Sequence, residues 1–358
     1  MEGLRGFAVF LVFLVHYVAL ILPWIPEGSA IATLAGALHE FGNTGVDLFF
    51  VLSGYLIYGS LMARPQPFAR FMSRRIQRIY PAFTAVFVLY VILSFVFTAE
   101  NRIPRPIFAG LLYLAENYLL LPGLFPIPPM ITVAWSLSYE MFYYLALPVA
   151  MALFHLRDRS ARWRVGFCAV TSVVTAVYCA GTNGPIRLIM FGAGIMLYEA
   201  IEGAVRPPGG VVGVVALVCG LLCTLLPIEG AAGSLLKYSL LCISFFVLCV
   251  ACFREPTGWL ATAFSWTPLR WLGNMSYSYY LLHGLTLKGA SLVLTATLPS
   301  SSNAWWLFWA LLPPMFALTL VPTALLFLGV ERPFSLSPGG VVNRVTAGST
   351  DVVPAAGA

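Results

Sequence analysis

Charged side chains are scarce in this sequence. Asp, Glu, Lys and Arg make up 9% of its 358 residues, whereas hydrophobic residues make up 60%. A soluble domain ordinarily carries about 25% charged residues, and so few charges cannot cover a globule of this length, which excludes a soluble enzyme. The formal net charge is +6, but the charged residues are too few to favour a nucleic-acid partner. The remaining class is a polytopic membrane protein, whose outer surface faces lipid.

The sequence also lacks the spacings of a metal site. Its four histidines, at positions 16, 39, 155 and 283, show no ligand pattern. Its seven cysteines lie in apolar stretches without a nearby His or carboxylate, as expected of small packing residues. We therefore predict no metal site and no permanently bound cofactor.

Long apolar runs predict an all-α fold with about ten transmembrane helices, because about twenty apolar residues are needed to cross a bilayer. An eleventh run, 107–121, is interrupted by Glu116 and Asn117 and is followed by four prolines, so it either spans the membrane or re-enters it. The ten predicted spans are 5–22, 45–62, 80–98, 134–154, 165–180, 185–202, 210–227, 235–253, 276–297 and 304–330.

The distribution of basic residues predicts the orientation, since Lys and Arg are enriched in cytoplasmic loops. With both termini cytoplasmic and 107–121 not crossing, fifteen of the twenty Lys and Arg residues lie on the inner face. A full crossing by 107–121 would move the arginine-rich segment 157–164 outside. We therefore expect residues 1–334 to form the membrane-embedded domain. Residues 335–358, rich in Gly, Ser, Ala and Val, are expected to form a flexible cytoplasmic tail.

The few polar residues inside the predicted spans are the functional candidates, because ionisable groups are costly within a bilayer. Arg5 and His16 lie about three turns apart on nearly the same face of the first helix. Arg5 could simply anchor the topology and His16 could be a packing residue. A neutral imidazole in a dry site could instead act as a general base toward a hydroxyl or thiol.

Two carboxylates are expected at the outer side of the membrane. Asp47 enters the second span from the outside, either at headgroup level or as the partner of an interior cation. Glu140 lies in an aromatic helix one turn after Ser136, in the outer half and at a depth similar to that of His16. Either carboxylate could orient His16, since a base is commonly positioned by a third group.

An arginine stripe precedes the third span. Arg74, Arg75 and Arg78 lie within two helical turns, and Pro81 is expected to mark the start of the next helix. Such a stripe is typical of anionic lipid binding, but arginine forks also match the oxygens of a phosphorylated ligand.

The ninth span carries a polar cluster at its inner end. Ser276, Tyr277 and His283 are predicted to line an inner cavity, with His283 in the membrane half opposite His16, although a polar packing cluster would show the same residues. Glu331 closes the last span on the inner face, where it could pair with the arginine stripe.

Together these segments resemble the acyltransferase-3 family of membrane-bound O-acyltransferases. The resemblance covers about residues 2–335, in the order expected of the family. The matching stretches are EGLRGFAVFLVFLVH, GVDLFFVLSGYLI, RRIQRIYP, WSLSYEMFYYL, LGNMSYSYYLLH and ERPFS. Members of that family modify lipopolysaccharide O-antigens, exopolysaccharides, nodulation factors and macrolides in the bacterial inner membrane.

The resemblance, together with the chemistry of the residues, predicts a role for each candidate residue. His16 would be the catalytic base, or the carrier of a covalent acyl group, and Glu140 and Asp47 would assist it. Four arginines would hold the phosphates of acyl-coenzyme A, the co-substrate: Arg5, Arg74, Arg75 and Arg78. The acceptor hydroxyl, on a carbohydrate or glycolipid, would meet Trp135, Ser136, Ser276, Tyr277 and His283.

A transport protein is the alternative. A proton-coupled transporter, or an exporter of a glycolipid or small molecule, would also have ten helices and buried His and Glu residues. It explains the arginine stripe less well, and it predicts no consumption of a thioester.

Overall fold

The protein is built from α-helices, as predicted. The computed structural model describes residues 1–203, 205–298 and 304–336, and these contain thirteen α-helices. The helices are α1 (Glu2–Ile21), α2 (Ala30–Ala63), α3 (Phe68–Val96), α4 (Ile107–Tyr118), α5 (Trp135–Leu153), α6 (Ala161–Thr182), α7 (Ile189–Glu202), α8 (Gly210–Cys223), α9 (Gly230–Arg254), α10 (Trp259–Phe264), α11 (Thr267–Asn274), α12 (Ser276–Thr297) and α13 (Leu307–Leu326).

Each of the ten predicted spans coincides with a helix. Within the described part of the chain, six helices are both long and apolar enough to cross a bilayer. They are α1, α2, α3, α6, α9 and α13, the first and last extended by the helical turns that follow them. The protein is therefore a polytopic membrane protein, while ten crossings with both termini inside remain a prediction.

Two helices begin well before the predicted spans. Helix α2 starts at Ala30, where the hydroxyl of Ser29 caps it by accepting a hydrogen bond from the Ala32 amide at 3.1 Å. Helix α3 starts at Phe68 and continues through Pro81, so the prediction that this proline begins a new helix was wrong. Hydropathy detects only the apolar part of a helix, whereas backbone hydrogen bonding continues through its polar ends.

The eleventh apolar run forms the short helix α4. Its twelve residues rise about 18 Å, which is less than the thickness of the hydrocarbon core. Buried Asn117 fixes the proline-rich loop beside it: its Oδ1 accepts from the Met130 amide at 2.7 Å, and its Nδ2 donates to the Pro128 carbonyl at 3.4 Å. A short helix with its own loop favours a segment that does not cross the membrane alone.

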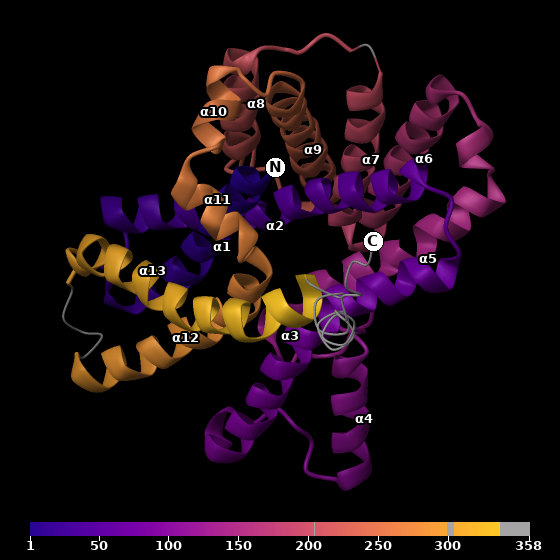
Figure 1. The fold of residues 1–358 in the computed structure, drawn as a ribbon. Helices are drawn as coiled ribbons and strands as arrows, with labels where there is room; N and C mark the ends of the chain where they lie inside the picture. Colours follow the sequence, from indigo (N-terminus) through magenta and orange to yellow (C-terminus); the bar gives the residue numbers. More distant parts are fainter. Residues whose placement is uncertain (204, 299–303, 337–358) are drawn as a thin grey trace, which may run out of the picture.

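Helix α1 is packed among helices from other parts of the chain (Figure 1). It contacts α2, α11, α12 and α13, and α2 in turn contacts α5 and α7. Helices α12 and α13 lie side by side, and α8 lies against α9. Residues distant in sequence on α1, α3, α5 and α12 are thereby brought around the same interior space.

Glycines set the closest helix crossings. A Cβ atom on Gly54 of α2 would collide with the Phe191 carbonyl of α7, and one on Gly194 would collide with the Val51 carbonyl. At the start of α1, Gly6 meets the Leu269 carbonyl of α11 in the same way. These contacts bring α2 directly against α7 and fix the position of Arg5 beside Gly6.

The last helix continues as a π-helical segment, η7 (Phe327–Leu336), which packs against α3. It therefore includes the first two residues of the tail predicted at 335–358. The rest of the predicted tail lies outside the described residues.

Candidate functional site

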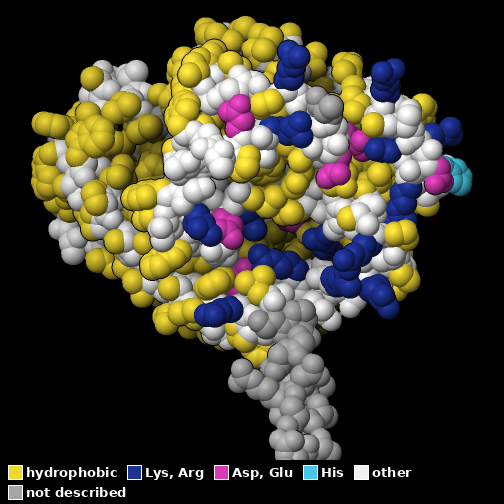
Figure 2. Space-filling model, turned by 45° about the horizontal axis from the view of Figure 1, so that its top comes forward, with side chains coloured by type: hydrophobic (Ala, Val, Ile, Leu, Met, Phe, Trp, Pro, Cys, Tyr) yellow, Lys and Arg dark blue, Asp and Glu magenta, His cyan; other side chains and the backbone are white. Residues whose placement is uncertain are grey.

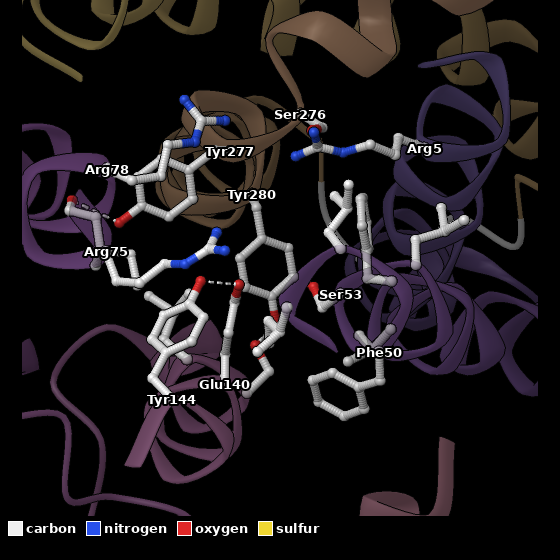
Figure 3. A pocket seen from close by; sticks show the side chains of 18 residues that line it. Arg5, Phe50, Ser53, Arg75, Arg78, Glu140, Tyr144, Ser276, Tyr277 and Tyr280 are labelled. Carbon is white, nitrogen blue, oxygen red and sulfur yellow. Dashed lines mark hydrogen bonds between the residues drawn. The ribbon is translucent and has the colours of Figure 1, made fainter. Parts of the chain in front are cut away.

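Three arginines converge on a cavity of about 130 Å³ between α1, α2, α3, α5 and α12. Arg5 comes from α1, and Arg75 and Arg78 come from the N-terminal half of α3 (Figure 3). Four more of the predicted site residues line the same space: Ser136, Glu140, Ser276 and Tyr277. We call this space the arginine cavity.

The last helical segment holds one of these arginines. Arg78 Nη1 lies 2.8 Å from Glu331 Oε1, and the Glu331 side chain is fully buried. Glu331 Oε2 also accepts from the Ser278 amide at 3.1 Å and from the Ser278 hydroxyl. The predicted pairing of Glu331 with the arginine stripe is confirmed, and it joins α3, α12 and η7 at the cavity wall.

Arg75 is held mainly by aromatic rings. Its guanidinium lies 5.1 Å from the ring centre of Phe71 and 5.2 Å from that of Tyr144, and it donates to the Ser60 hydroxyl at 2.7 Å. The Tyr144 hydroxyl donates to Glu140 Oε1 inside the cavity (Figure 3). Glu140 therefore supports the ring on which Arg75 rests.

The location of Glu140 corrects its predicted pairing with His16. We expected the two groups at one depth in the outer half of the membrane, but Glu140 shares the arginine cavity with Arg5. Residue counting measures distance along a helix axis, and tilt changes the depth that this distance represents.

Arg74 does not join the other arginines. It is exposed, and its guanidinium lies 3.5 Å from the Gln66 side chain. Successive residues on a helix point about 100° apart, so Arg74 and its neighbour Arg75 cannot face the same space.

One polar group in the arginine cavity is unpaired. The Ser276 hydroxyl is buried and has no hydrogen-bond partner among the described residues. Such a group in a native interior is normally satisfied by a ligand or by water. The cavity thus combines fixed cations with a free hydroxyl, a composition suited to a phosphorylated ligand.

His16 lines a second and larger cavity, of about 640 Å³. We call this space the histidine cavity. Its wall includes Tyr90 and Lys288, and the loop after α3 contributes Glu100 and Arg102. Glu100 and Lys288 form an exposed ion pair at 3.0 Å. The opening is therefore polar, whereas apolar side chains of α12 cover much of the interior.

His283 lies against His16, and this overturns its predicted place in the opposite half of the membrane. The two ring centres are 4.8 Å apart, with the planes at 60°. His283 is fully buried, and its Nδ1 lies 2.9 Å from the Tyr279 carbonyl. Gly273, at the end of α11, meets Glu2 and Gly6 of α1, so His16 and His283 each lie about ten residues beyond a shared level.

A hydrogen-bonded group separates the two cavities. The Tyr280 hydroxyl donates to the Val133 carbonyl at 3.0 Å and accepts from the Ser136 hydroxyl at 2.8 Å. Tyr280 and Ser136 line the arginine cavity, whereas Val133 lines the histidine cavity. The ring centre of Tyr280 is 6.0 Å from that of His283. The arginines and His16 are thus on opposite sides of a thin wall.

Two predicted site residues lie elsewhere. Asp47 is buried, and its Oδ2 is 3.7 Å from Nη1 of Arg187; neither carboxylate oxygen makes a hydrogen bond with the described residues. Trp135 packs near this pair, with its ring centre 5.5 Å from the Arg187 guanidinium. Asp47 is therefore the partner of an interior cation, one of the two alternatives left open by the sequence.

Sequence reasoning did not identify the arginines that pair with two buried carboxylates of the described residues, Asp47 and Glu199. The sequence does offer an indication for Arg187. It is a lone cation at the end of an apolar run, at the same predicted membrane depth as Asp47. The second pair is Arg164 with buried Glu199, joined by two contacts of 2.6 Å. Glu199 also accepts from the Tyr58 hydroxyl at 2.6 Å, so this pair is a structural link between α2, α6 and α7.

The surface agrees with a membrane-embedded molecule. Figure 2 shows Lys and Arg side chains gathered around a hollow on one face, while hydrophobic side chains cover much of the rest of that view. Exposed apolar residues are numerous on α3, α6 and α8. Lipid can cover such surfaces, whereas water would not.

Comparison with known proteins agrees with these features. The acyltransferase-3 family, described as an acyltransferase domain, matches residues 1–327. The chain belongs to this family. The resemblance seen in its sequence motifs is thereby confirmed.

Several similar proteins are named as O-acetyltransferases or putative O-acetyltransferases. The chain is 26% identical to the peptidoglycan O-acetyltransferase OatA of Listeria monocytogenes over 300 residues, or 74% of this chain and 47% of OatA. It is 27% identical to the putative peptidoglycan O-acetyltransferase YrhL of Bacillus subtilis over 321 residues, or 79% of this chain and 47% of YrhL. A putative O-acetyltransferase of Staphylococcus aureus is 24% identical over 73% of the chain and 50% of its own length.

The chain therefore spans about half the length of the curated relatives it matches. No solved structure matches this one. The roles of individual residues consequently rest on the geometry of the two cavities.

Proposed function

We propose that this acyltransferase moves an acetyl group from acetyl-coenzyme A to a hydroxyl of a cell-envelope glycan, in the bacterial inner membrane. The observation that carries the proposal is the placement of Arg5 and His16. Both lie on α1, yet Arg5 lines the arginine cavity and His16 lines the histidine cavity. One helix thus links a phosphate-binding space to a basic nitrogen across a thin wall.

Acetyl-coenzyme A enters the arginine cavity, which we place on the cytoplasmic side. Its phosphates bind Arg5, Arg75 and Arg78, whose forked guanidinium groups match phosphate oxygens. The pantetheine arm follows in the same cavity, where the free Ser276 hydroxyl can bind one of its amides. The thioester then reaches the wall formed by Tyr280 and Ser136, and its carbonyl carbon passes between these two side chains to meet the acceptor.

The acceptor occupies the histidine cavity, whose greater volume suits a sugar. His16 removes the proton of the acceptor hydroxyl, and the resulting alkoxide attacks the thioester carbonyl carbon. The C–O bond of the ester forms, the C–S bond breaks, and coenzyme A leaves as a thiolate that takes up the proton from His16. Transfer of the acetyl group first to His16 and then to the acceptor would use the same residues.

The wall between the cavities also contains a hydroxyl that can stabilise the negative charge on the thioester oxygen during the attack. If Ser136 turns its hydrogen to the Val133 carbonyl, which is 3.3 Å away, the Tyr280 hydroxyl can donate to the thioester oxygen. The Val133 carbonyl keeps a donor in both arrangements, so the exchange leaves no buried group unpaired. Tyr280 is therefore our candidate for the oxyanion donor.

The other predicted residues have supporting roles in this proposal. Glu140 and Tyr144 position Arg75 from inside the cavity. Asp47 and Arg187 hold Trp135, the first residue of α5. Family membership favours acyl transfer over the transport alternative.

The deciding experiment measures transfer of labelled acetyl from acetyl-coenzyme A to glycan acceptors by the purified full chain in lipid. Substitution His16→Ala should lower the transfer rate by about 100- to 10,000-fold, the usual effect of losing a general base. His155→Ala is the matched control and should leave the rate unchanged, because His155 follows α5 and lines neither cavity. Full transfer by a folded His16→Ala protein would refute the role of His16, and consumption of the thioester without labelled product would indicate a hydrolase.

A further inference from the structure

The tautomer of His283 is fixed by its own helix. Its Nδ1 lies 2.9 Å from the backbone carbonyl of Tyr279, and a carbonyl oxygen can only accept a hydrogen bond. Nδ1 must therefore carry the hydrogen, which leaves Nε2 with a lone pair. The ring is also held by stacking on Tyr279, with centres 5.2 Å apart and planes within 10°. His283 thus offers a single acceptor nitrogen in a fixed direction.

That acceptor is unsatisfied. His283 is fully buried, and its Nε2 has no hydrogen-bond partner among the residues that the structure describes. A buried polar atom without a partner costs about 1–3 kcal/mol. If the position served only for packing, leucine or methionine would fill it without this cost.

The aromatic neighbours of His283 leave one donor for this nitrogen. The Thr319 hydroxyl donates to the Phe316 carbonyl at 2.6 Å, so the Tyr279 hydroxyl, 2.9 Å from Thr319, is committed to Thr319. The Tyr280 hydroxyl donates to the Val133 carbonyl in the structure and to the thioester oxygen in the proposed reaction, so it is engaged in both arrangements. His16 remains, with its ring centre 4.8 Å away, half-buried at the edge of the histidine cavity.

We propose that His283 is a positioning residue for His16. A rotation of the His16 ring about its Cβ–Cγ bond brings one of its N–H groups onto His283 Nε2, since the two ring centres are already close enough. That hydrogen bond fixes the His16 tautomer and directs its other nitrogen, with a free lone pair, into the histidine cavity. The inference rests on the proposed role of His16 as the base.

The pair also accommodates the charge that forms during the reaction. When His16 takes the proton of the acceptor hydroxyl, the resulting imidazolium donates a charge-assisted hydrogen bond to His283 Nε2. The proton stays on His16 and leaves with the thiolate of coenzyme A, so His283 keeps its own hydrogen on Nδ1 throughout. A neutral imidazole thus does what a carboxylate does in many base–orienter pairs, without a second charge in the membrane.

Two substitutions of similar volume test the inference. His283→Met removes the acceptor, and we expect kcat to fall on the order of 100-fold with KM unchanged for both substrates. His283→Gln supplies a side-chain oxygen near the position of Nε2, so it should recover most of that loss. Equal kcat values for the two variants, whether both normal or both reduced, would show that the position serves only for packing.

A measurement on the unaltered protein covers the case in which neither variant folds. The chain has four histidines, so selective 15N labelling gives few signals in solid-state NMR of the protein in bilayers. We expect His283 protonated at Nδ1 and a coupling across an N–H···N bond between His16 and His283. Protonation of His283 at Nε2, or absence of that coupling, would overturn the inference.

The two proposals fail in different ways. If His16→Ala abolishes transfer but His283→Met leaves kcat intact, only the positioning role is wrong. If His16→Ala itself retains full transfer, the proposed function of His16 is wrong, and the NMR coupling would then report a structural contact only.

Discussion

Arg78 and Glu331 are 253 positions apart in the sequence and form an ion pair of 2.8 Å at the wall of the arginine cavity. The arginine remains about a quarter exposed, whereas the carboxylate is fully buried. Glu331 therefore balances the charge of a guanidinium that lines the arginine cavity. The segment η7 thereby holds the N-terminal half of α3 in place.

This relationship predicts the effect of Glu331→Gln. The amide still accepts from Ser278, but it no longer balances the Arg78 charge, so the guanidinium should become mobile. We expect KM for acetyl-coenzyme A to rise several-fold and thermal stability to fall, because removing one partner of a buried pair is destabilising. Michaelis–Menten kinetics and a thermal-unfolding curve of the purified protein check this. An unchanged KM would show that Arg78 needs no such support.

The arginines of the stripe should differ in their effect on acetyl-coenzyme A binding, because only two of them line the arginine cavity. Arg75→Ala and Arg78→Ala should each raise KM for acetyl-coenzyme A about tenfold or more, because each removes a charge-assisted bond to phosphate, worth about 1.5–3 kcal/mol. Arg74→Ala is the matched control on the same helix turn and should have little effect, since Arg74 is exposed outside the cavity. Equal effects of all three substitutions would favour lipid binding by the whole stripe.

Tyr280 is expected to act on the rate rather than on binding. Tyr280→Phe keeps the ring that separates the cavities and removes the hydroxyl, so kcat should fall about 100- to 1,000-fold, as for loss of an oxyanion donor, with KM for acetyl-coenzyme A unchanged. Tyr279→Phe removes an equally buried hydroxyl bonded to Thr319 and should have a much smaller effect on kcat. Similar kinetics for the two variants would remove Tyr280 from the mechanism.

Replacing glycine by alanine at two positions of α2 should have opposite effects on stability. A Cβ on Gly54 would collide with the Phe191 carbonyl, whereas a Cβ on Gly36 would meet nothing within 4 Å. Gly54→Ala should therefore force α2 and α7 apart and cost roughly 1–3 kcal/mol of stability. Gly36→Ala should be neutral or stabilising, because alanine is the better helix former. Thermal unfolding in the same detergent distinguishes them, and equal stability would contradict the close crossing.

Several features could be derived from the order of residues alone. Scarce charge and repeated apolar runs determined a polytopic α-helical membrane protein, because only such runs can satisfy the backbone inside lipid. The spacing of Arg5 and His16, with the later motifs, determined the family. The chemical nature of each candidate also follows from sequence, since an arginine binds anions and a neutral imidazole accepts protons wherever they are placed.

Only the tertiary structure decided which of these groups meet. Sequence counting placed His16 with Glu140 and far from His283, whereas the fold pairs His16 with His283 and places Glu140 with Arg5. The reason is that depth in a membrane depends on the tilt and crossing of helices, which arise from close contacts such as those at Gly6 and Gly54. A sequence specifies the period of each helix, but packing between helices selects the partners of its polar faces.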